Sequence, residues 1–201
     1  MDSQDRRAST ATSGPVPSHD DQDERALLSR TAARDRDAFK ALYIVYHRRL
    51  ARFLVRMTRQ YDVAEEIIND TMWVVWQRAG DFRGTSRVST WIMGIAYRRA
   101  LKTLRRANLQ SRFVTYDEEV EYTDQGAEVD GEERRQLVTR ALAELPLEQR
   151  LVLEFAYYLG HSCTEIAEIM ECPVNTVKTR MFHARRKLRA LMPALSGTAG
   201  E

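Results

Sequence analysis

The residues best suited to specific chemistry lie near the C-terminus, from Pro173 to Met192, where the sequence has six Lys or Arg and no acidic residue. At 100° per residue, one apolar stripe of a helix would consist of Val177, Met181, Ala184 and Leu188. The opposite side would carry polar, aromatic and cationic groups, which suit base edges and phosphates in the major groove of DNA. The residues predicted to contact DNA on this helix are Asn175, Thr176, Lys178, Thr179, Arg180, Phe182, His183, Arg185 and Arg186.

The segment just before this helix carries the signals of a short helix and a sharp turn. Gly160 can end the preceding helix in a left-handed conformation, and Ser162 with Glu165 fits a capping box. Pro173 suits the first position of the next helix, because its missing N–H would have no partner there. These features predict a helix-turn-helix that binds DNA through its second helix. The alternative, a solvated basic face on an ordinary helix, leaves the cap, the turn and the proline unexplained.

A second basic segment, DFRGTSRVSTWIMGIAYRRALKTLRR at residues 81–106, places a small polar loop before a helix from about Trp91 to Arg106. Aromatic rings beside cations are typical of single-stranded DNA binding, because rings stack on bases while cations hold the backbone. A pocket that captures an extruded base can also trap a melted duplex. For Trp91, core packing with an indirect role in shaping the loop is the favoured interpretation. The residues predicted to contact single-stranded DNA are Phe82, Arg83, Ser86, Arg87, Trp91, Arg98, Arg99 and Lys102.

A third candidate surface lies on a helix predicted over DVAEEIINDTMWVVW, which begins at Asp62. One side of this helix is apolar, while Trp73 lies among acidic and amide residues on the other side. Large aromatic side chains ringed by polar groups mark protein interfaces. The alternative is that Trp73 packs against the helix that contains Phe39 or against an unrecognised neighbour. The residues predicted to bind a protein partner are Glu65, Glu66, Asn69, Asp70, Trp73 and Gln77.

The distribution of charge divides the chain into parts. The net charge of +2 hides nine Lys or Arg and one acid between Arg78 and Arg112, and nine acids with no base between Asp117 and Glu133. Helical periodicity is present on both sides of the acidic stretch, and no segment alternates like a strand. We therefore predict an all-α protein with two small helical domains joined by a flexible acidic linker. The predicted boundaries are residues 1–24 for a disordered tail, 25–106 for the first domain, 107–132 for the linker, 133–192 for the second domain and 193–201 for a C-terminal tail.

Several functional classes find no support in the sequence. Cys163 and Cys172 form no CxxC pair, and their spacing with His161 and His183 fits no common zinc pattern, so neither a metal nor a cofactor is predicted. No Ser, Tyr or carboxylate cluster has a credible catalytic setting, so the chain is not expected to be an enzyme. No apolar run is long enough to span a bilayer, and the N-terminus lacks the apolar region of a secretory signal. The cytoplasm is therefore the expected compartment.

Motifs in both predicted domains resemble one family of bacterial proteins. In residues 165–188, EIAEIM, CPVNTVKTRMF and HARRKL resemble region 4.2 of the extracytoplasmic-function (ECF) sigma factors, a group of the sigma-70 family. The helix DVAEEIINDTMWVVW resembles region 2.2, and FRG, STW and IAYRRA resemble regions 2.3 and 2.4. The sequence departs from residues usual in the family at Asn69, Met72, Arg98 and Asn175. The change at Arg98 implies that the preferred −10 sequence could differ.

This resemblance implies a promoter-specificity subunit of bacterial RNA polymerase. The first domain would be sigma region 2, which docks on the clamp coiled coil of the largest polymerase subunit through the surface around Trp73. Its second basic segment would melt the −10 element and catch a flipped base. The second domain would be sigma region 4, which reads the −35 element, and an anti-sigma factor is a common further partner in the family. The acidic linker would be either a solvated spacer or a mimic of nucleic acid that threads toward the RNA exit path.

A stand-alone helix-turn-helix regulator is the alternative function. It accounts for residues 134–192 but gives no role to the helix around Trp73 or to the basic segment at 81–106. Binding to core polymerase would separate the two hypotheses.

Overall fold

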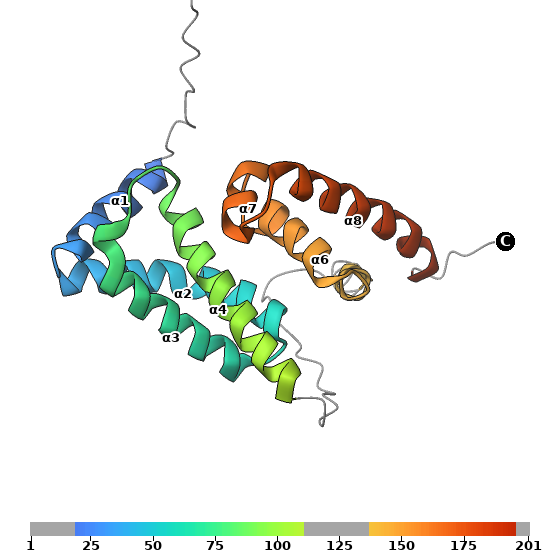
Figure 1. Ribbon diagram of the computed structural model, residues 1–201, viewed down its shortest axis with the longest axis horizontal. Coiled ribbons are helices and arrows are strands. Elements are labelled where there is room, and N and C mark those ends of the chain that lie inside the picture. Colours follow the sequence, from blue (N-terminus) through green and yellow to red (C-terminus); the bar gives the residue numbers. More distant parts are fainter. Residues whose placement is uncertain (1–18, 111–136, 196–201) are drawn as a thin grey trace, which may run out of the picture.

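The computed structural model of the protein describes residues 19–110 and 137–195, and these two stretches contain helices and turns but no strand (Figure 1). The first stretch consists of α1 (His19–Ala32), α2 (Arg36–Thr58), α3 (Tyr61–Arg78), the 3₁₀ turn η1 (Ala79–Asp81) and α4 (Val88–Gln110). The second consists of a helix at 137–143, α6 (Leu147–Leu153), the π-helical turn η3 (Glu154–Tyr158), α7 (Cys163–Met170) and α8 (Val174–Leu195). The predicted all-α fold is confirmed. In the same two stretches, no helix is both long enough and apolar enough to cross a membrane.

The core of the first domain is formed by α2, α3 and α4. Asp35 starts α2 as its cap, because its carboxylate accepts hydrogen bonds from the backbone N–H groups of Asp37 at 2.9 Å and Ala38 at 3.1 Å. The apolar side predicted for α3 faces inward, with Ile68 and Val75 fully buried between the neighbouring helices. Burial of one side of α3 leaves its other side as an outer surface of the domain.

The first domain starts earlier than predicted. α1 begins at His19, so the prediction of a disordered tail is wrong for residues 19–24. Glu24 lies in this stretch, is 6% exposed, and accepts hydrogen bonds from Tyr46 and Arg49 of α2. A composition argument counts apolar surface, whereas this carboxylate is stabilised by charge-assisted hydrogen bonds to distant residues. That is why the composition did not indicate that α1 begins at His19.

The other predicted boundaries are tested only in part. α4 continues to Gln110, beyond the predicted domain limit at residue 106, and α8 continues to Leu195, beyond the predicted limit at residue 192. The predicted linker beyond residue 110, the tail before residue 19 and the chain after residue 195 lie outside the described residues.

The helix-turn-helix is formed by α7 and α8. Its capping box is present, because the Ser162 hydroxyl accepts a hydrogen bond from the Glu165 N–H at 3.3 Å and the Glu165 carboxylate accepts one from the Ser162 N–H at 2.8 Å. Gly160 adopts the expected left-handed conformation with φ +68. The turn between the helices is made at Glu171, with φ 51, and α8 then begins at Val174. Local signals therefore set both ends of this motif.

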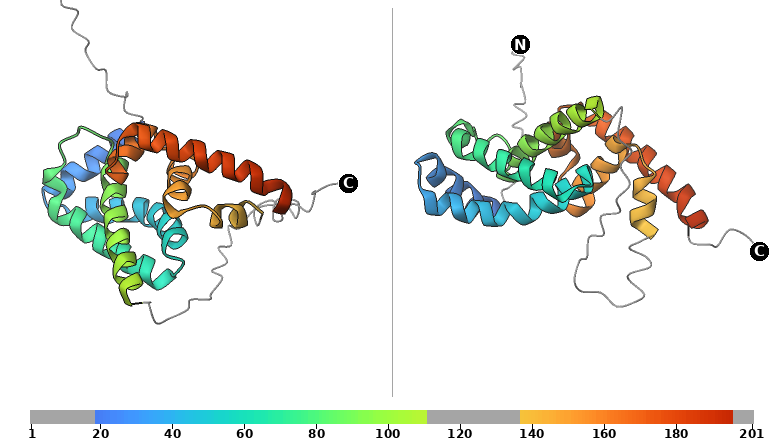
Figure 2. Two further views of the ribbon diagram at one scale, coloured as in Figure 1. Left: turned by 45° about the vertical axis from the view of Figure 1, so that its right-hand side comes forward. Right: turned by 90° about the horizontal axis from the view of Figure 1, so that it is seen from below.

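The two domains pack directly against each other. α7 lies beside α4 (Figure 1), and one apolar core runs from α2 and α4 into the second domain. Phe155 of η3 is fully buried at this contact, with its ring centre 4.8 Å from that of Phe53 and 6.2 Å from that of Tyr97. The further views in Figure 2 show α8 extending from this contact away from the first domain. The prediction of two tethered domains did not include the contact.

Candidate DNA and polymerase interfaces

The predicted recognition helix α8 has an apolar inner face and a polar outer face. Val177 and Ala184 are fully buried, whereas Phe182 on the opposite side is 60% exposed. The stripe therefore faces inward, as its periodicity predicts. The residues of the predicted DNA-binding set that are exposed are Asn175, Lys178, Thr179, Phe182, Arg185 and Arg186, and those that are half-buried are Thr176, Arg180 and His183.

The two flanks of α8 differ in how their cations are held. On one flank, Arg180 forms an ion pair with Glu148 of α6, and the Lys187 ammonium donates a hydrogen bond to the backbone carbonyl of Glu144. On the other flank, Lys178 is exposed, and no hydrogen-bond or ion-pair partner of its side chain lies among the described residues. An incoming phosphate would compete with Glu148 for Arg180 but would meet no competing acid at Lys178.

The loop between η1 and α4, residues 82–87, lies on a pair of aromatic rings. The centres of the Phe82 and Trp91 rings are 5.6 Å apart, and both side chains are half-buried against the core. Trp91 packs against the core, as the favoured interpretation has it, and its indirect role in shaping the loop stays a prediction. Arg83, next to Phe82 in the loop, is exposed, and Lys102 is exposed on α4 about three turns beyond Trp91.

Glu165 of α7 reaches the start of α4. Its carboxylate accepts a hydrogen bond from the Thr90 hydroxyl at 3.3 Å and lies 3.7 Å from the Arg87 guanidinium. The same side chain caps α7, and its hydrogen bonds from Ser162 together with its charged neighbours lower the pKa of its carboxyl, although burial acts the other way. One residue thus serves both the helix-turn-helix and the contact between the domains.

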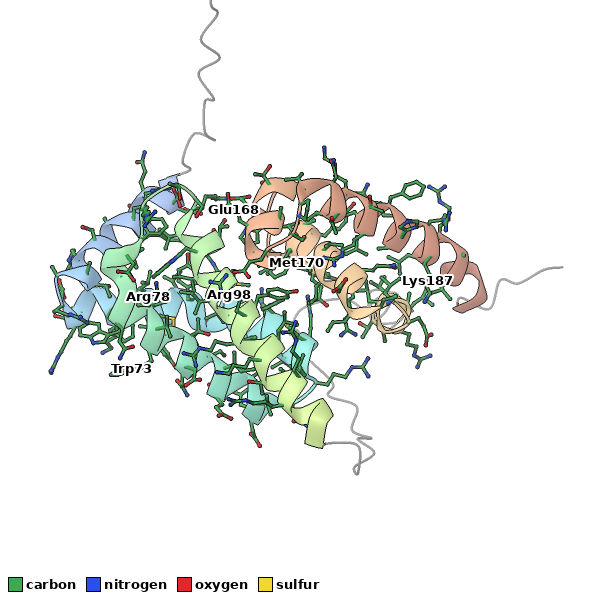
Figure 3. The ribbon with its side chains drawn as sticks, in the orientation of Figure 1. Trp73, Arg78, Arg98, Glu168, Met170 and Lys187 are labelled. Atoms are coloured by element: carbon green, nitrogen blue, oxygen red, sulfur yellow. The ribbon has the colours of Figure 1, made fainter. Side chains whose placement is uncertain are left out.

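Two further acidic residues of the helix-turn-helix contact the second basic segment. Glu168 is hydrogen-bonded to the Ser86 side chain, and Glu171 pairs with Arg98 at 3.0 Å. Figure 3 shows Glu168 and Arg98 at the boundary between the two domains. Glu165, Glu168 and Glu171 recur at every third residue and lie opposite the basic segment at 81–106. This charge complementarity was the available sign in the sequence that the two domains make contact.

The outer face of α3 carries the predicted protein-binding residues. Trp73 is 58% exposed and projects from α3 at the outer edge of the first domain (Figure 3). The alternative that Trp73 packs against α2 is wrong, because it is Trp76 whose ring lies 5.1 Å from that of Phe39. The other exposed members of the predicted set are Glu66, Asn69, Asp70 and Gln77, and Glu65 is half-buried.

This outer face is larger than the sequence analysis predicted. Tyr43 of α2 donates a hydrogen bond from its hydroxyl to the Asn69 side-chain oxygen at 3.1 Å, so α2 contributes to the face. Asp70 pairs with Arg99 of α4 at 2.8 Å, which joins the face to the basic segment. The aromatic residues at Phe39 and Tyr43, one helical turn apart, were the available sign that α2 borders this face.

The contact between the domains also buries two titratable groups. Glu154 is 3% exposed, and burial raises the pKa of its carboxyl to about 7, although Arg56 and Arg150 act to lower it. His161 is 6% exposed, and burial lowers the pKa of its imidazole to about 4. Neither Glu154 Oε2 nor His161 Nδ1 has a hydrogen-bond partner among the described residues. Burial therefore favours the uncharged form of both groups.

A helix-turn-helix, a basic segment and a separate aromatic docking face define a transcription protein that binds both DNA and another protein. The sigma-70 region 2 family model matches residues 42–110, and the sigma-70, region 4 model matches residues 135–188. The chain is 31% identical over 176 residues to the ECF RNA polymerase sigma factor SigM of Mycobacterium tuberculosis, covering 88% of each chain. It is 29% identical to the RNA polymerase sigma-H factor of Pseudomonas aeruginosa, over 87% of this chain and 96% of that protein.

The fold has been seen in a solved structure of the sigma factor RpoE in complex with the anti-sigma factor NepR from Bartonella quintana. That structure matches with a TM-score of 0.65 and 24% identity, over 77% of this chain and 96% of that one. The chain belongs to the ECF group of the sigma-70 family. It binds core RNA polymerase and directs promoter-specific initiation, and it carries out no enzymatic step itself. The stand-alone regulator is set aside, because region 2 is present together with region 4.

Proposed function

We propose that three surfaces divide the work of this sigma factor. The α3 face around Trp73 binds core polymerase, the loop at 82–87 together with α4 captures the melted −10 strand, and the outer face of α8 reads the −35 duplex. The observation that carries the proposal is Trp73 itself, which is 58% exposed among polar side chains on a helix whose other side is buried. Aromatic anchors of this kind contribute most of the binding energy in protein interfaces.

Charge and exposure support the −10 assignment. Arg83 is exposed next to the aromatic pair under the loop, and Lys102 is exposed further along α4, which suits a strand whose bases stack while its phosphates are neutralised. Arg98 is held by Glu171 in an ion pair whose two side chains are 44% and 66% exposed. Such a pair contributes little in water, so Arg98 could exchange it for a phosphate at small cost.

Under this proposal, promoter binding requires the two domains to separate. Ser86 and Arg98 bind residues of the helix-turn-helix in the packed arrangement. Arg98 can exchange its exposed pair easily, but the −10 strand can use the whole surface only after α7 moves away. Polymerase binding would supply the free energy that uncovers the apolar contact around Phe155. Once both domains are held on polymerase, their connection raises the effective concentration of each at its promoter element.

Two further assignments belong to the same proposal. The bacterial cytoplasm is the proposed compartment, because RNA polymerase acts there on the chromosome. An anti-sigma factor that holds the domains together would keep the −10 surface covered, and we propose a protein of that class as a regulatory partner. The two roles predicted for the acidic linker stay predictions.

The test is capture of the full-length chain by tagged core RNA polymerase. Trp73→Ala should weaken core binding by about 2 kcal/mol or more, roughly 30-fold, because it removes the aromatic anchor. Its thermal unfolding should match that of the wild type, since an exposed side chain contributes little to the core. Tyr61→Ala is the matched control, because Tyr61 is a 56% exposed aromatic residue on the same helix, about three turns away. Normal holoenzyme assembly by Trp73→Ala would contradict the proposal.

A further inference from the structure

α1 contacts the 82–87 loop, although none of the proposed DNA contacts lies on α1. Asp21 of α1 is 2% exposed, and its Oδ1 accepts a hydrogen bond from the backbone N–H of Val88 at 3.2 Å. Val88 is the first residue of α4, so Asp21 acts as a cap for a helix that starts 67 residues later in the chain. A carboxylate in this place satisfies an unpaired N–H and is favoured by the helix dipole.

Arg25, one turn after Asp21 on α1, holds the backbone of the same loop. Its Nη2 donates to the carbonyl of Ser86 at 2.7 Å and its Nη1 to the carbonyl of Gly84 at 3.3 Å, while its Nε donates to Asp21 Oδ2 at 2.7 Å. Its guanidinium carbon lies 5.5 Å from the centre of the Phe82 ring. Gly84 has φ +70, and a Cβ there would come within 3.2 Å of Arg25 Nη1. The planar guanidinium of Arg25 therefore links the buried Asp21 carboxylate to two backbone carbonyls of the loop and holds the loop in place.

We propose that Asp21 and Arg25 are positioning residues for −10 recognition, and that they fix the shape of the 82–87 loop before DNA arrives. This inference rests on the proposed function, in which the loop captures the melted strand. A loop that is already ordered loses less conformational entropy on binding and holds its contact groups in register. Neither residue has to touch DNA, because Asp21 is buried and three donors of Arg25 are directed to Asp21 and the loop.

The contacts that α1 makes with the loop are separable from those that α7 makes. α1 binds backbone carbonyls of the loop. α7 binds other side chains of the loop, through Glu168 to Ser86 and Glu165 to Arg87. When α7 moves away, the contacts from Glu165 and Glu168 are lost while α1 still holds the loop backbone. The loop thus keeps the same shape with the domains packed and with the domains apart.

The test compares promoter melting and −10 base preference in holoenzymes assembled from full-length variants. The probe is a promoter mapped by run-off transcription on host genomic DNA, with its −10 positions randomised. Arg25→Ala should lower open-complex formation about tenfold and flatten the preference among −10 bases, because charged hydrogen bonds to the loop are lost. Binding to core polymerase and to a −35 duplex should not change. Asp21→Asn keeps an acceptor for Val88 but removes the charge that faces Arg25, so it should show a smaller loss of the same kind.

Two controls separate this inference from the function on which it rests. Arg30→Ala removes an exposed α1 cation that pairs with Asp35 and should behave as the wild type. If Arg83→Ala in the loop leaves the −10 preference intact, the loop does not read the −10 element and the proposed function fails.

A different result would overturn the inference alone. If Arg83→Ala loses the −10 preference while Arg25→Ala and Asp21→Asn keep it, the loop reads the element without help from α1. Where Arg25→Ala unfolds too readily to assemble, Asp21→Asn decides: a flattened preference supports the role of α1, and a wild-type preference overturns it.

Discussion

All proposed −35 contacts lie on the one helix α8. The proposed −10 surface instead combines a loop with α4, and its residues also form bonds with α1, α3 and the helix-turn-helix. On α8, burial of Val177 and Ala184 fixes the inner face, and the outer face follows from the turn of the helix. At the −10 surface, Arg99 pairs with α3, Arg98 pairs with Glu171 after α7, and the loop backbone is held by α1.

Of these two surfaces, only the proposed −10 surface depends on the arrangement of the domains. The outer face of α8 stays exposed with the domains packed, so region 4 could meet duplex DNA in either arrangement. The region 2 surface is partly occupied by the helix-turn-helix, so its use is tied to domain separation.

The largest expected effect concerns the two titratable groups buried where the regions meet. The folded pKa of Glu154 is about 7, above the ordinary 4.5, so the folded state holds the proton more tightly and stability is lost as pH rises from 4.5 to 7. The loss is on the order of 3 kcal/mol. The folded pKa of His161 is about 4, below the ordinary 6.5, so stability is lost as pH falls from 6.5 to 4. Between pH 4.5 and 6.5 the two contributions oppose each other.

Replacing either residue should therefore remove its own pH-dependent contribution, which then appears as the difference between the variant and the wild type. Relative to the wild type, Glu154→Gln should have a free energy of unfolding that rises by about 3 kcal/mol as pH rises from 4.5 to 7. His161→Gln should show the opposite trend, with a relative free energy of unfolding that falls as pH rises from 4 to 6.5. Urea denaturation across this pH range measures both. Two variants that run parallel to the wild type would mean that the contact does not desolvate these groups.

A smaller effect is expected on the α8 surface, where the two flanks can be compared. Lys178→Ala should weaken binding of the full-length chain to a −35 duplex by ~1–3 kcal/mol, because Lys178 meets no competing acid. Arg180→Ala should cost less, since Arg180 is already paired with Glu148. Glu148→Gln is the matched control and should leave binding unchanged or slightly tighter. Fluorescence anisotropy at two salt concentrations measures each, and equal losses from Lys178→Ala and Arg180→Ala would remove the distinction between the flanks.

The smallest effect is expected from the exposed ion pair at the rim of the domain contact. A double-mutant cycle on Arg98→Ala and Glu171→Gln should give a coupling free energy below about 1 kcal/mol, because both side chains are largely solvated. Thermal unfolding of the four proteins of the cycle supplies the measurement. A coupling above about 2 kcal/mol would show that charge, rather than burial of Phe155, holds the regions together.

The parts of the site that could be predicted are those whose signals are local. The cap at Ser162, the left-handed Gly160 and the apolar stripe of α8 each depend on residues within a few positions along the chain, and all are present. The exposure of Trp73 followed from its polar neighbours on the same helix. The packing of Trp91 against the core also agrees with the favoured interpretation of that residue.

The parts that could not be predicted depend on partners far away in the chain. The first turns of α1, residues 19–24, were interpreted as part of a disordered tail, because Asp21 and Glu24 find their donors in α4 and α2 only when these helices pack beside them. The contact at Phe155 was missed because a buried aromatic residue in one domain does not indicate which other domain covers it. Tyr43 was missed because its hydroxyl joins the α3 face only through Asn69.

By itself the sequence determined the helices, their caps and the side of each that is apolar, since these depend on interactions over about four residues along the chain. Only the tertiary structure decided which polar groups stay available for a partner. Glu165 forms one bond of each kind: its capping box with Ser162 is local, while its hydrogen bond from Thr90 joins residues 75 positions apart. Such a bond depends on how whole helices pack, and no pattern within either helix specifies that packing.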